Sequence, residues 1–440
     1  MMFTKEELIS STGAKVLKDN GSEKTFEIST DTRTITDKAI YLPLKGENFD
    51  GEKFIDSENI FAYFTTSNVA TDRATFVLQV EDTKKAYLEI ARYYREKINP
   101  ITIAITGSAG KTTTKELVYS VVSQKYKTRK TFSNHNNEIG FCQTILGMEK
   151  DTEALIIEAG MRGLGEIELI SKHLKPDYAI ITNCGSAHIG RLGSLDNIAI
   201  AKCEITSGLN ENGTFIALDQ NITKKHLKFK GEKIFYSLQD VNILNKAPSY
   251  TKFEYKNNIY ELNVEGEYNV ENSLSAIELG FKLGLTTQQI KNGLKSYHPI
   301  EKRWEAQQIC EFKFINDSYN ANPESMKASV KTFIELYKNP VVILGNMGEL
   351  GENEIEYHKE VGRYLSGLSK NVKYITVGSL AEEIAKELKI KGIDVKCFNS
   401  NIETARYIVE NLDESNTIFL KASRAMKFED IIENVKKRDI

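Results

Sequence analysis

The sequence contains few cysteines and no long apolar segment. Its 440 residues include five cysteines, which are scattered and form no Cys-x-x-Cys pair. This spacing argues against a structural zinc site and indicates a reducing compartment. No apolar stretch is long enough to span a bilayer, and the N-terminus lacks the apolar segment of a signal peptide. We therefore expect a cytoplasmic protein without membrane insertion.

The sequence also lacks an excess of charge of either sign. It carries 58 basic and 61 acidic residues and no long run of one charge. Nucleic-acid-binding proteins normally show a basic excess, so nucleic acid is not an expected partner. The hydrophobic fraction of 40% is typical of globular domains with packed cores, and the length suggests about three domains.

One strand-to-helix junction carries the clearest functional pattern. Residues 101–106 are mostly β-branched and predict a buried strand, which a helical pattern soon follows. Between them, Gly107 and Gly110 frame a tight turn that ends in Gly-Lys-Thr. In phosphate-binding loops the backbone N–H groups and the lysine, here Lys111, face the phosphates, and the next hydroxyl, here Thr112, ligates Mg²⁺. We therefore predict a nucleotide site here.

The loop departs from the general phosphate-loop pattern at one position. That pattern has a glycine five residues before Gly110, and this chain has Ile105 there. An ordinary surface turn is the alternative, although Gly-Lys-Thr rarely falls at a strand-to-helix junction by chance. The residues predicted to bind ATP in this loop are Gly107, Ser108, Ala109, Gly110, Lys111, Thr112 and Thr113.

Two further strands of the same unit end in polar residues. An apolar strand from Ala154 ends at Glu158, and a second strand from Ala179 is followed by His188. The carboxyl ends of parallel strands meet at one edge of a sheet, so both side chains should approach the phosphate loop. A carboxylate in this position often holds Mg²⁺. The structural alternatives are a helix N-terminal acid for Glu158 and a packed histidine for His188.

The pattern of strands and helices divides the chain into three α/β units. Residues 1–84 predict a small α/β unit, 85–299 a central parallel sheet with the phosphate loop, and 300–440 a Rossmann-like unit. The glycine spacing of the turn at 345–351 does not fit a dinucleotide fingerprint. In the first unit, Asp31 either begins a turn held by its own side chain or belongs to a binding site.

Together these stretches resemble the Mur ligases of peptidoglycan synthesis over nearly the whole chain. The resemblance rests on the phosphate loop and on the following segments: Asn136–Gly140, Glu158–Met161, Ala187–His188, Ala201–Lys202, Gly266–Asn272 and Asp317–Pro323. The stretch Ser-Tyr-Asn-Ala-Asn-Pro at 318–323 is similar to that of the family members that add D-alanyl-D-alanine. Two positions depart from the family pattern, Asn346 for aspartate and Ala422 for glycine.

The resemblance implies an ATP-dependent acid–amino-acid ligase. The expected reaction joins D-alanyl-D-alanine to UDP-N-acetylmuramoyl-tripeptide through an acyl phosphate and releases ADP and phosphate. It implies three domains: a UDP-substrate domain at 1–84, an ATP-binding domain at 85–299 and a C-terminal Rossmann-like domain at 300–440. We expect a monomer.

The resemblance also assigns roles to single residues. Lys111 would neutralise the transferred phosphoryl group, Thr112 and Glu158 would hold one Mg²⁺, and His188 would hold a second. Lys202 would carry a carbamate formed with CO₂, because an ammonium beside Mg²⁺ would be repelled. Without the resemblance, Lys202 would be interpreted as an exposed helix lysine.

The remaining expected site residues fall into three groups, all implied by the resemblance. The nucleotide contacts are Asn272, Arg303, Asp317 and Asn320; the UDP-substrate contacts are Asp31, Thr32, Arg33, Asn136 and Asn137; the acceptor and closure residues are Lys421, Ser423 and Arg424.

Four alternative functions fit the sequence less well. Folylpolyglutamate synthase begins close to its phosphate loop, whereas 106 residues precede Gly107 here. The ligase specific for diaminopimelate carries an Asp-Asn-Pro-Arg motif, which this sequence lacks. A phosphate-loop switch or motor normally keeps the glycine that Ile105 replaces. A catalytically inactive binding protein is disfavoured by the intact Lys111, Thr112 and Glu158.

Overall fold

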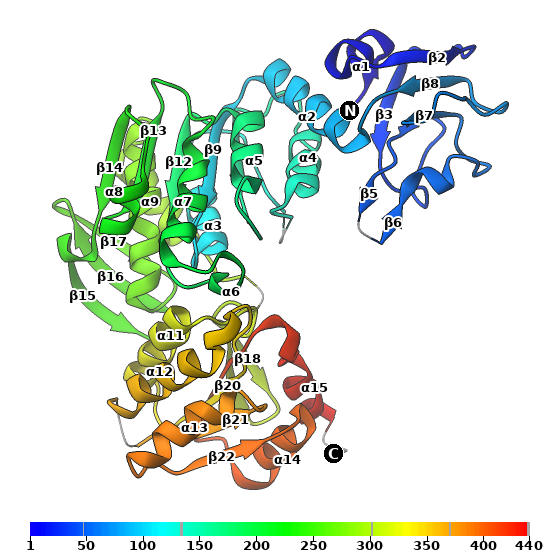
Figure 1. Cartoon of the computed structure of the whole chain (residues 1–440). Helices are drawn as coiled ribbons and strands as arrows, with labels where there is room; N and C mark the ends of the chain where they lie inside the picture. Colours follow the sequence, from blue (N-terminus) through cyan, green and yellow to red (C-terminus); the bar gives the residue numbers. More distant parts are fainter. Residues whose placement is uncertain (47, 133–134, 301, 369–370, 438–440) are drawn as a thin grey trace.

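The computed structural model of this chain describes residues 1–46, 48–132, 135–300, 302–368 and 371–437. Figure 1 shows an N-terminal sheet at one end, a C-terminal sheet at the other and a parallel sheet between them. This mixed α/β arrangement confirms the predicted fold class. No helix within these ranges combines the length and apolar character needed to cross a membrane.

The N-terminal unit is built on a mixed sheet. In the described residues its strand order is β1-β3-β4-β7-β8-β2, with β1 and β2 antiparallel at the two edges and the inner strands parallel. Phe26 and Phe76 stack in its core with ring centroids 5.2 Å apart. The elements are β1 (Phe3–Thr4), α1 (Lys5–Thr12), β2 (Lys15–Asp19), β3 (Thr25–Ser29), β4 (Ala39–Tyr41), β5 (Lys45–Gly46), β6 (Phe49–Asp50), the 3-10 turn Gly51–Phe54, β7 (Ala62–Thr65) and β8 (Phe76–Gln79).

The central unit is an all-parallel sheet covered by helices. Its described strand order is β10-β11-β9-β12-β13-β14. Strands β9 and β11 are mostly apolar, and all their residues except Ile101 are buried, as expected where helices cover both faces. The elements are α2 (Thr83–Ile98), β9 (Ile101–Thr106), α3 (Lys111–Val122), β10 (Thr128–Lys130), α4 (Glu138–Leu146), β11 (Ala154–Glu158), α5 (Glu166–Leu174), β12 (Tyr178–Ile181), α6 (Ile189–Leu192), α7 (Leu195–Cys203), the 3-10 turn Glu204–Thr206, β13 (Thr214–Leu218), α8 (Asn221–His226) and β14 (Glu232–Tyr236).

The central unit also contains an antiparallel sheet that the sequence pattern did not reveal. Strands β15 (Val241–Ala247), β16 (Tyr250–Tyr255) and β17 (Asn258–Leu262) follow β14 and a 3-10 turn at Leu238–Asp240. Alternate residues of β16 are buried, and Phe253 stacks on Tyr260 across the strands. Helices α9 (Glu267–Lys282) and α10 (Thr287–Lys295) complete this unit and pack against α3.

The C-terminal unit is a mostly parallel sheet with one antiparallel edge strand. The described order is β18-β19-β23-β20-β21-β22, and only β18 runs antiparallel to its neighbour. The elements are β18 (Glu305–Ile309), β19 (Phe312–Asn316), α11 (Pro323–Leu336), β20 (Pro340–Gly345), the 3-10 turn Gly351–Asn353, α12 (Glu354–Ser366), β21 (Lys373–Val377), α13 (Ala381–Ile390), β22 (Val395–Phe398), α14 (Asn401–Asn411), β23 (Thr417–Lys421), the 3-10 turn Arg424–Met426 and α15 (Glu429–Lys437).

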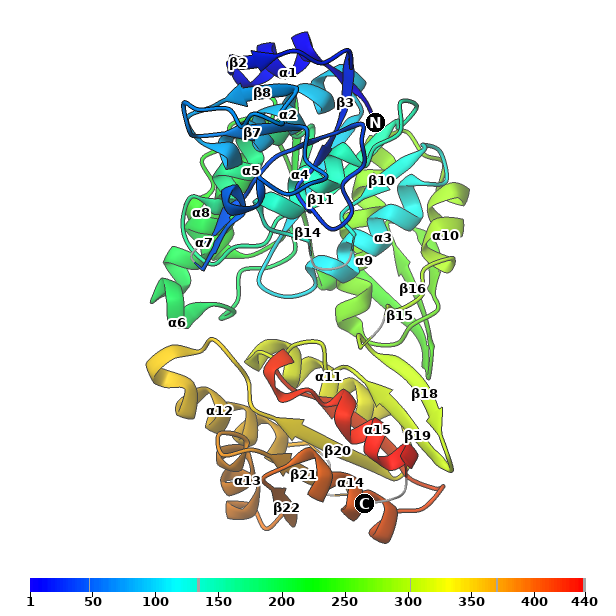
Figure 2. The same ribbon diagram turned by 90° about the vertical axis from the view of Figure 1, so that its right-hand side faces the viewer.

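The topology places the carboxyl ends of β9, β11 and β12 side by side. These three strands are neighbours in the central sheet, with Glu158 of β11 opposite Ile105 of β9. Figure 2 shows that this sheet and the C-terminal unit lie one above the other, with α6 between them. A ligand at this sheet edge therefore lies within reach of residues from both units.

Candidate active site

The phosphate loop is held by the end of the neighbouring strand. The backbone N–H of Ser108 donates to the carbonyl oxygen of Asn183 at 2.9 Å, and the N–H of Ala109 donates to its side-chain Oδ1 at 2.9 Å. Helix α3 begins at Lys111 without a side-chain cap on Gly110. Its first N–H groups therefore remain available to phosphate oxygens. Sequence reasoning missed Asn183 as a site residue, although it is the last residue of a predicted strand.

The departure at Ile105 has a simple structural reason. Ile105 is fully buried and belongs to β9, where it pairs with Glu158. The strand therefore continues through the position at which the general pattern has a glycine. The turn begins only at Gly107, and it is correspondingly short.

The predicted magnesium ligands of the first site lie together. The Thr112 hydroxyl donates to Oε1 of Glu158 at 3.2 Å, and the Asn136 amide donates to the same oxygen at 3.1 Å. Lys115 lies 3.5 Å from the other carboxylate oxygen, and Glu158 is only 2% exposed. A hydroxyl and a carboxylate are hard oxygen donors that fit Mg²⁺, which keeps several waters and phosphate oxygens as its other ligands. The residues present therefore fit one magnesium ion.

The second predicted metal site is less complete. His188 lines the same cavity, and its Nδ1 lies 2.5 Å from a carboxylate oxygen of Glu349 in the C-terminal unit. Lys202 on α7 is fully buried and is not among the residues that line the cavity. Within the described chain, no group of three or more His, Cys, Asp or Glu side chains is arranged to hold a metal.

The Lys202 side chain has an unusual environment. Its Nζ is buried and makes no hydrogen bond with any described residue. Burial, together with the charge of Lys111, holds the pKa of Lys202 well below its usual range. The sequence alone would have placed this lysine on an exposed helix face, and that interpretation is wrong. A neutral amine is the form that reacts with CO₂.

A cavity of about 790 Å³ extends from the phosphate loop to the C-terminal unit. Arg303 enters it from the segment before β18, where Nη2 donates to the Thr112 hydroxyl at 3.0 Å. Its guanidinium lies over the Tyr319 ring, 3.9 Å from the centroid. The predicted nucleotide contacts Asn272, Asp317 and Asn320 also line the cavity. The structure thus brings Arg303 directly to the phosphate loop.

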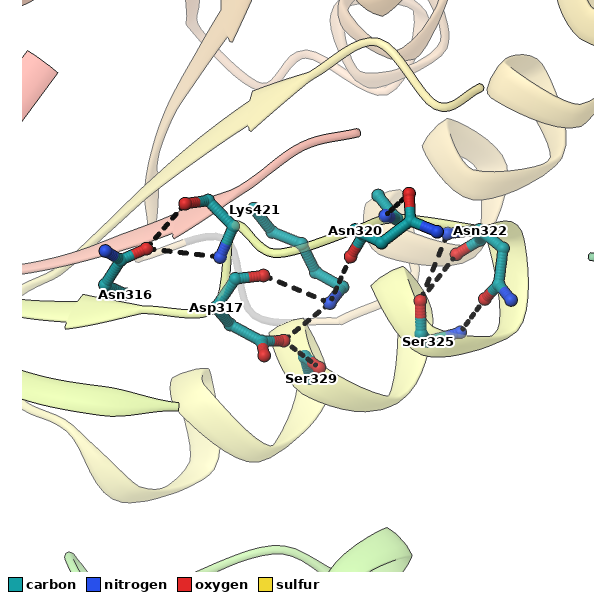
Figure 3. A network of polar contacts seen from close by, with 9 residues as sticks. Asn316, Asp317, Asn320, Asn322, Ser325, Ser329 and Lys421 are labelled. Atoms are coloured by element: carbon teal, nitrogen blue, oxygen red, sulfur yellow. Dashed lines mark hydrogen bonds and ion pairs between the residues drawn. The ribbon is translucent and has the colours of Figure 1, made fainter. Parts of the chain in front are cut away.

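The start of α11 is organised by a polar network, which Figure 3 shows. The Lys421 ammonium donates to Oδ2 of Asp317 at 2.6 Å and to the carbonyl oxygen of Asn320 at 3.3 Å. Ser329 donates to the same Asp317 oxygen at 2.8 Å. Asn322 caps α11 by accepting the N–H of Ser325. The network fixes Asp317 and Asn320 at the cavity wall and leaves Lys421 with its charge already paired.

The other two predicted acceptor residues lie outside the cavity lining. The Ser423 N–H donates to the carbonyl oxygen of Asn346 at 2.9 Å. The Arg424 side chain is 58% exposed and lies 3.4 Å from a Glu429 oxygen. Its guanidinium is also 6.0 Å from the centroid of Tyr319, which does line the cavity.

The predicted UDP-substrate residues fall in two places. Asp31 accepts the backbone N–H of Arg33 at 3.0 Å and pairs with its guanidinium at 2.9 and 2.7 Å. These hydrogen bonds lower the pKa of Asp31 to about 2. The segment around Thr32 is therefore a turn held by an Asp side chain, on the N-terminal unit and away from the cavity lining. Asn136 and Asn137 line the cavity instead, where Asn137 caps α4.

Glu271 on α9 is a half-buried carboxylate in the cavity wall. Its carboxylate makes no hydrogen bond or ion pair with any described residue, and burial raises its pKa to about 7. The folded state therefore binds this proton more tightly than the unfolded chain does. By linkage, the free energy of unfolding falls as pH rises from about 4.5 to about 7.

We expect Glu271→Gln to be more stable than the unmodified protein at pH 8, by about 1–3 kcal/mol. At pH 4.5 the difference should nearly vanish, because the Glu271 carboxyl is then protonated in the folded state. Urea unfolding of both proteins at the two pH values measures this. A stability difference that is the same at both pH values would contradict the assignment.

Comparison with known proteins agrees with this arrangement. The Mur ligase middle domain matches residues 105–280, and the Mur ligase glutamate ligase domain matches residues 302–424. The UDP-N-acetylmuramoyl-tripeptide–D-alanyl-D-alanine ligase of Bacillus subtilis (strain 168) is 34% identical over 425 residues, which cover 93% of this chain and 92% of that protein. The chain belongs to the Mur ligase family.

Solved Mur ligase structures share the whole architecture. A crystal structure of MurF from Acinetobacter baumannii has a TM-score of 0.88 at 27% identity and covers 99% of both chains. MurF from Thermotoga maritima in complex with ADP has a TM-score of 0.83 at 24% identity, covering 94% of this chain and 97% of that chain. The predicted family and its three-domain fold are thereby confirmed.

Proposed function

We propose that this Mur ligase joins D-alanyl-D-alanine to UDP-N-acetylmuramoyl-tripeptide with ATP, in the synthesis of peptidoglycan precursors. The names of the relatives support this reaction. The observation that carries it is the cavity in which Lys111, Thr112 and Glu158 of the central unit face Arg303 and Asp317. Nucleotide and acyl substrate can meet there.

The reaction begins with the attack of a carboxylate on the γ-phosphate of ATP. Both reactants are anions, so the protein must hold them together and offset their charge, and it need not supply a nucleophile. In this proposal Lys111 and the N-terminus of α3 bind the phosphates. Arg303, which already donates to Thr112, contacts the γ-phosphate. The acceptor amine then attacks the acyl phosphate, and phosphate leaves.

Magnesium would be held by Thr112 and Glu158, with His188 contributing to a second site. When bound, the metal offsets charge on the transferring phosphoryl group. The buried cation Lys115 stands 3.5 Å from Glu158, so it keeps this carboxylate compensated and oriented.

Lys202 is proposed to carry a carbamate. Its Nζ is buried and has no hydrogen-bond partner in the part of the chain that the structure describes, which supports this assignment. The lowered pKa of Lys202 supplies the neutral amine that CO₂ requires. The carbamate would convert a lysine into an anionic oxygen donor. The side chain would then need to turn toward His188 and the cavity.

The UDP part of the substrate is assigned to the N-terminal unit. Arg33 is exposed and Asp31 is half-buried in a preformed turn there, and Thr32 lies between them. Asn136 and Asn137 lie at the nucleotide cavity, where they would meet the peptide end of the same long substrate. We keep the domain limits at 1–84, 85–299 and 300–440, although α2 begins at Thr83. We also propose that the protein is a cytoplasmic monomer.

The decisive experiment is a product analysis. The protein is incubated with ATP, Mg²⁺, D-alanyl-D-alanine and either the lysine or the diaminopimelate form of the UDP-tripeptide. We expect the mass of the corresponding UDP-pentapeptide with one form, and ADP formation only when both substrates are present. A phosphate-loop switch would instead hydrolyse nucleotide without acceptor, and that result would contradict the proposal.

The acceptor carboxylate is assigned to Arg424. Lys421 is already paired with Asp317, whereas the Arg424 guanidinium is exposed and can grip a carboxylate with two hydrogen bonds. We expect Arg424→Ala to raise the KM for D-alanyl-D-alanine at least about tenfold, while the Kd for ATP changes little. The matched control is Arg406→Ala on the α14 surface. An unchanged KM for the dipeptide would remove Arg424 from the acceptor site.

A further inference from the structure

The central and C-terminal units touch along a segment that the mechanism above does not use. Ser186 donates its backbone N–H and its hydroxyl to the two carboxylate oxygens of Glu324, each at 2.9 Å. The N–H of Gly190 donates to the carbonyl oxygen of Glu349 at 3.1 Å. We call these contacts, together with the approach of Gly190 to Gly351, the interdomain contact. It lies directly beside His188.

Gly190 and Gly351 bring two backbones into contact. A Cβ added to Gly190 would lie 2.4 Å from the Gly351 nitrogen, and one added to Gly351 would lie 2.5 Å from the Gly190 Cα. Gly190 lies in the short helix α6 and does not have a positive φ, so its own backbone would accept alanine. The requirement for glycine at 190 therefore comes from the approach of the C-terminal unit.

The turn that carries Glu349 is held firmly by its own unit. The Met347 N–H donates to Nε2 of the buried His358 at 2.9 Å. The Asn346 side-chain oxygen accepts the N–H of Ala381 at the start of α13, also at 2.9 Å. This contact gives Asn346, one of the departures from the family pattern, a structural role that needs no charge. Glu349 consequently moves with the C-terminal unit as a whole.

The Glu349 carboxylate meets His188 across the interdomain contact. One of its oxygens lies 2.5 Å from Nδ1 of His188 without forming an aligned hydrogen bond, and both residues line the cavity. With the carboxylate beside Nδ1, we infer that Nε2 is the ring nitrogen left for a ligand. A histidine that binds a metal commonly donates its other N–H to a carboxylate, which fixes the tautomer and the ring orientation. Here the histidine and its carboxylate partner belong to different units, so the pair exists only when the units are closed.

We propose that Glu349 is a positioning residue for the ligation. Closure of the C-terminal unit, limited by the Gly190–Gly351 contact, places its carboxylate on Nδ1 of His188 and turns Nε2 toward the cavity. This inference rests on the proposed role of His188. If the inference is correct, the His188 ring is oriented for the reaction only when the central and C-terminal units are closed.

The first test measures closure itself. Spin labels are placed at Lys172→Cys on α5 and Lys391→Cys beside α13, with the accessible Cys310 and Cys397 replaced by serine. Distances are recorded with Mg²⁺, a non-hydrolysable ATP analogue and UDP-tripeptide. We expect Gly190→Ala to lower the ratio of closed to open molecules about tenfold. Gly163→Ala is the matched control, because a Cβ there meets no atom within 4 Å.

The second test separates positioning from simple packing. We expect Glu349→Ala to lower kcat about 10–100-fold with the Kd for ATP unchanged, and Glu349→Gln to recover part of this loss, because an amide oxygen still accepts from Nδ1. Arg191→Ala removes only the exposed 3.4 Å pair with Glu349 and should leave kcat nearly unchanged.

The double variant completes the test. If both residues act through one contact, Gly190→Ala with Glu349→Ala should be no slower than the slower single variant. The inference would be overturned if the Gly190→Ala protein closed normally. It would also be overturned if the fold-losses in kcat of the two single variants multiplied in the double variant. Failure of the proposed function looks different, because then the unmodified protein itself forms no UDP-pentapeptide.

Discussion

Replacing Lys111 by alanine should lower the ligation rate about 10²–10³-fold. The ammonium now donates to the carbonyl oxygen of Gly107 at 2.7 Å, at the entrance to α3. No hydrophobic core residue depends on it, so the fold should persist. With ATP bound, this charge would move to the phosphates and offset the negative charge that builds up when two anions approach.

The measurement is kcat/KM for pentapeptide formation, followed alongside ADP release. Thermal unfolding of Lys111→Ala should match that of the unmodified protein. Lys172→Ala on the outer face of α5 is the control for the loss of one lysine. Near-normal ligation by a folded Lys111→Ala protein would show that the loop does not bind the transferred phosphate as proposed.

Replacing Lys202 should also lower the ligation rate strongly. We expect Lys202→Ala and Lys202→Met to lose about 10–100-fold or more in activity, because both lack the amine that forms the carbamate. Methionine fills most of the volume of the buried lysine side chain. A loss of activity in Lys202→Met therefore reflects the missing amine and not a cavity in the core. Acetate should partly restore Lys202→Ala by supplying a carboxylate in the vacated space. It should not restore Lys202→Met, whose side chain occupies that space.

A spectroscopic measurement gives an independent readout. In ¹³C-labelled bicarbonate, the unmodified protein should show a carbamate signal that both variants lack. The reaction is chemically reasonable because the Lys202 Nζ is fully buried and has no hydrogen-bond partner among the described residues, an environment that favours the neutral amine. Full activity of the unmodified protein without any carbamate signal would refute the assignment.

The sequence by itself determined the central sheet and its phosphate loop. The β-branched run at 101–106 and the Gly-Lys-Thr turn have local signatures, since strand formation and phosphate binding depend on neighbouring residues. The convergence of Glu158 and His188 also followed, because parallel strands end at one sheet edge. The antiparallel strands at 241–262 were not predicted. Their half-exposed faces are rich in lysine and asparagine, which weakens the alternation of apolar and polar residues that indicates a strand.

Only the tertiary structure decided which charges meet. The pairing of Lys421 with Asp317 spans 104 positions, and the contact of His188 with Glu349 joins two separate units. The burial of Lys202 likewise depends on what packs against α7. Such contacts follow from the placement of whole domains, and no periodic pattern along the chain records that placement. For this reason residue types and spacing predicted the chemistry of the site. The side chains that contact the site residues could be identified only from the folded structure.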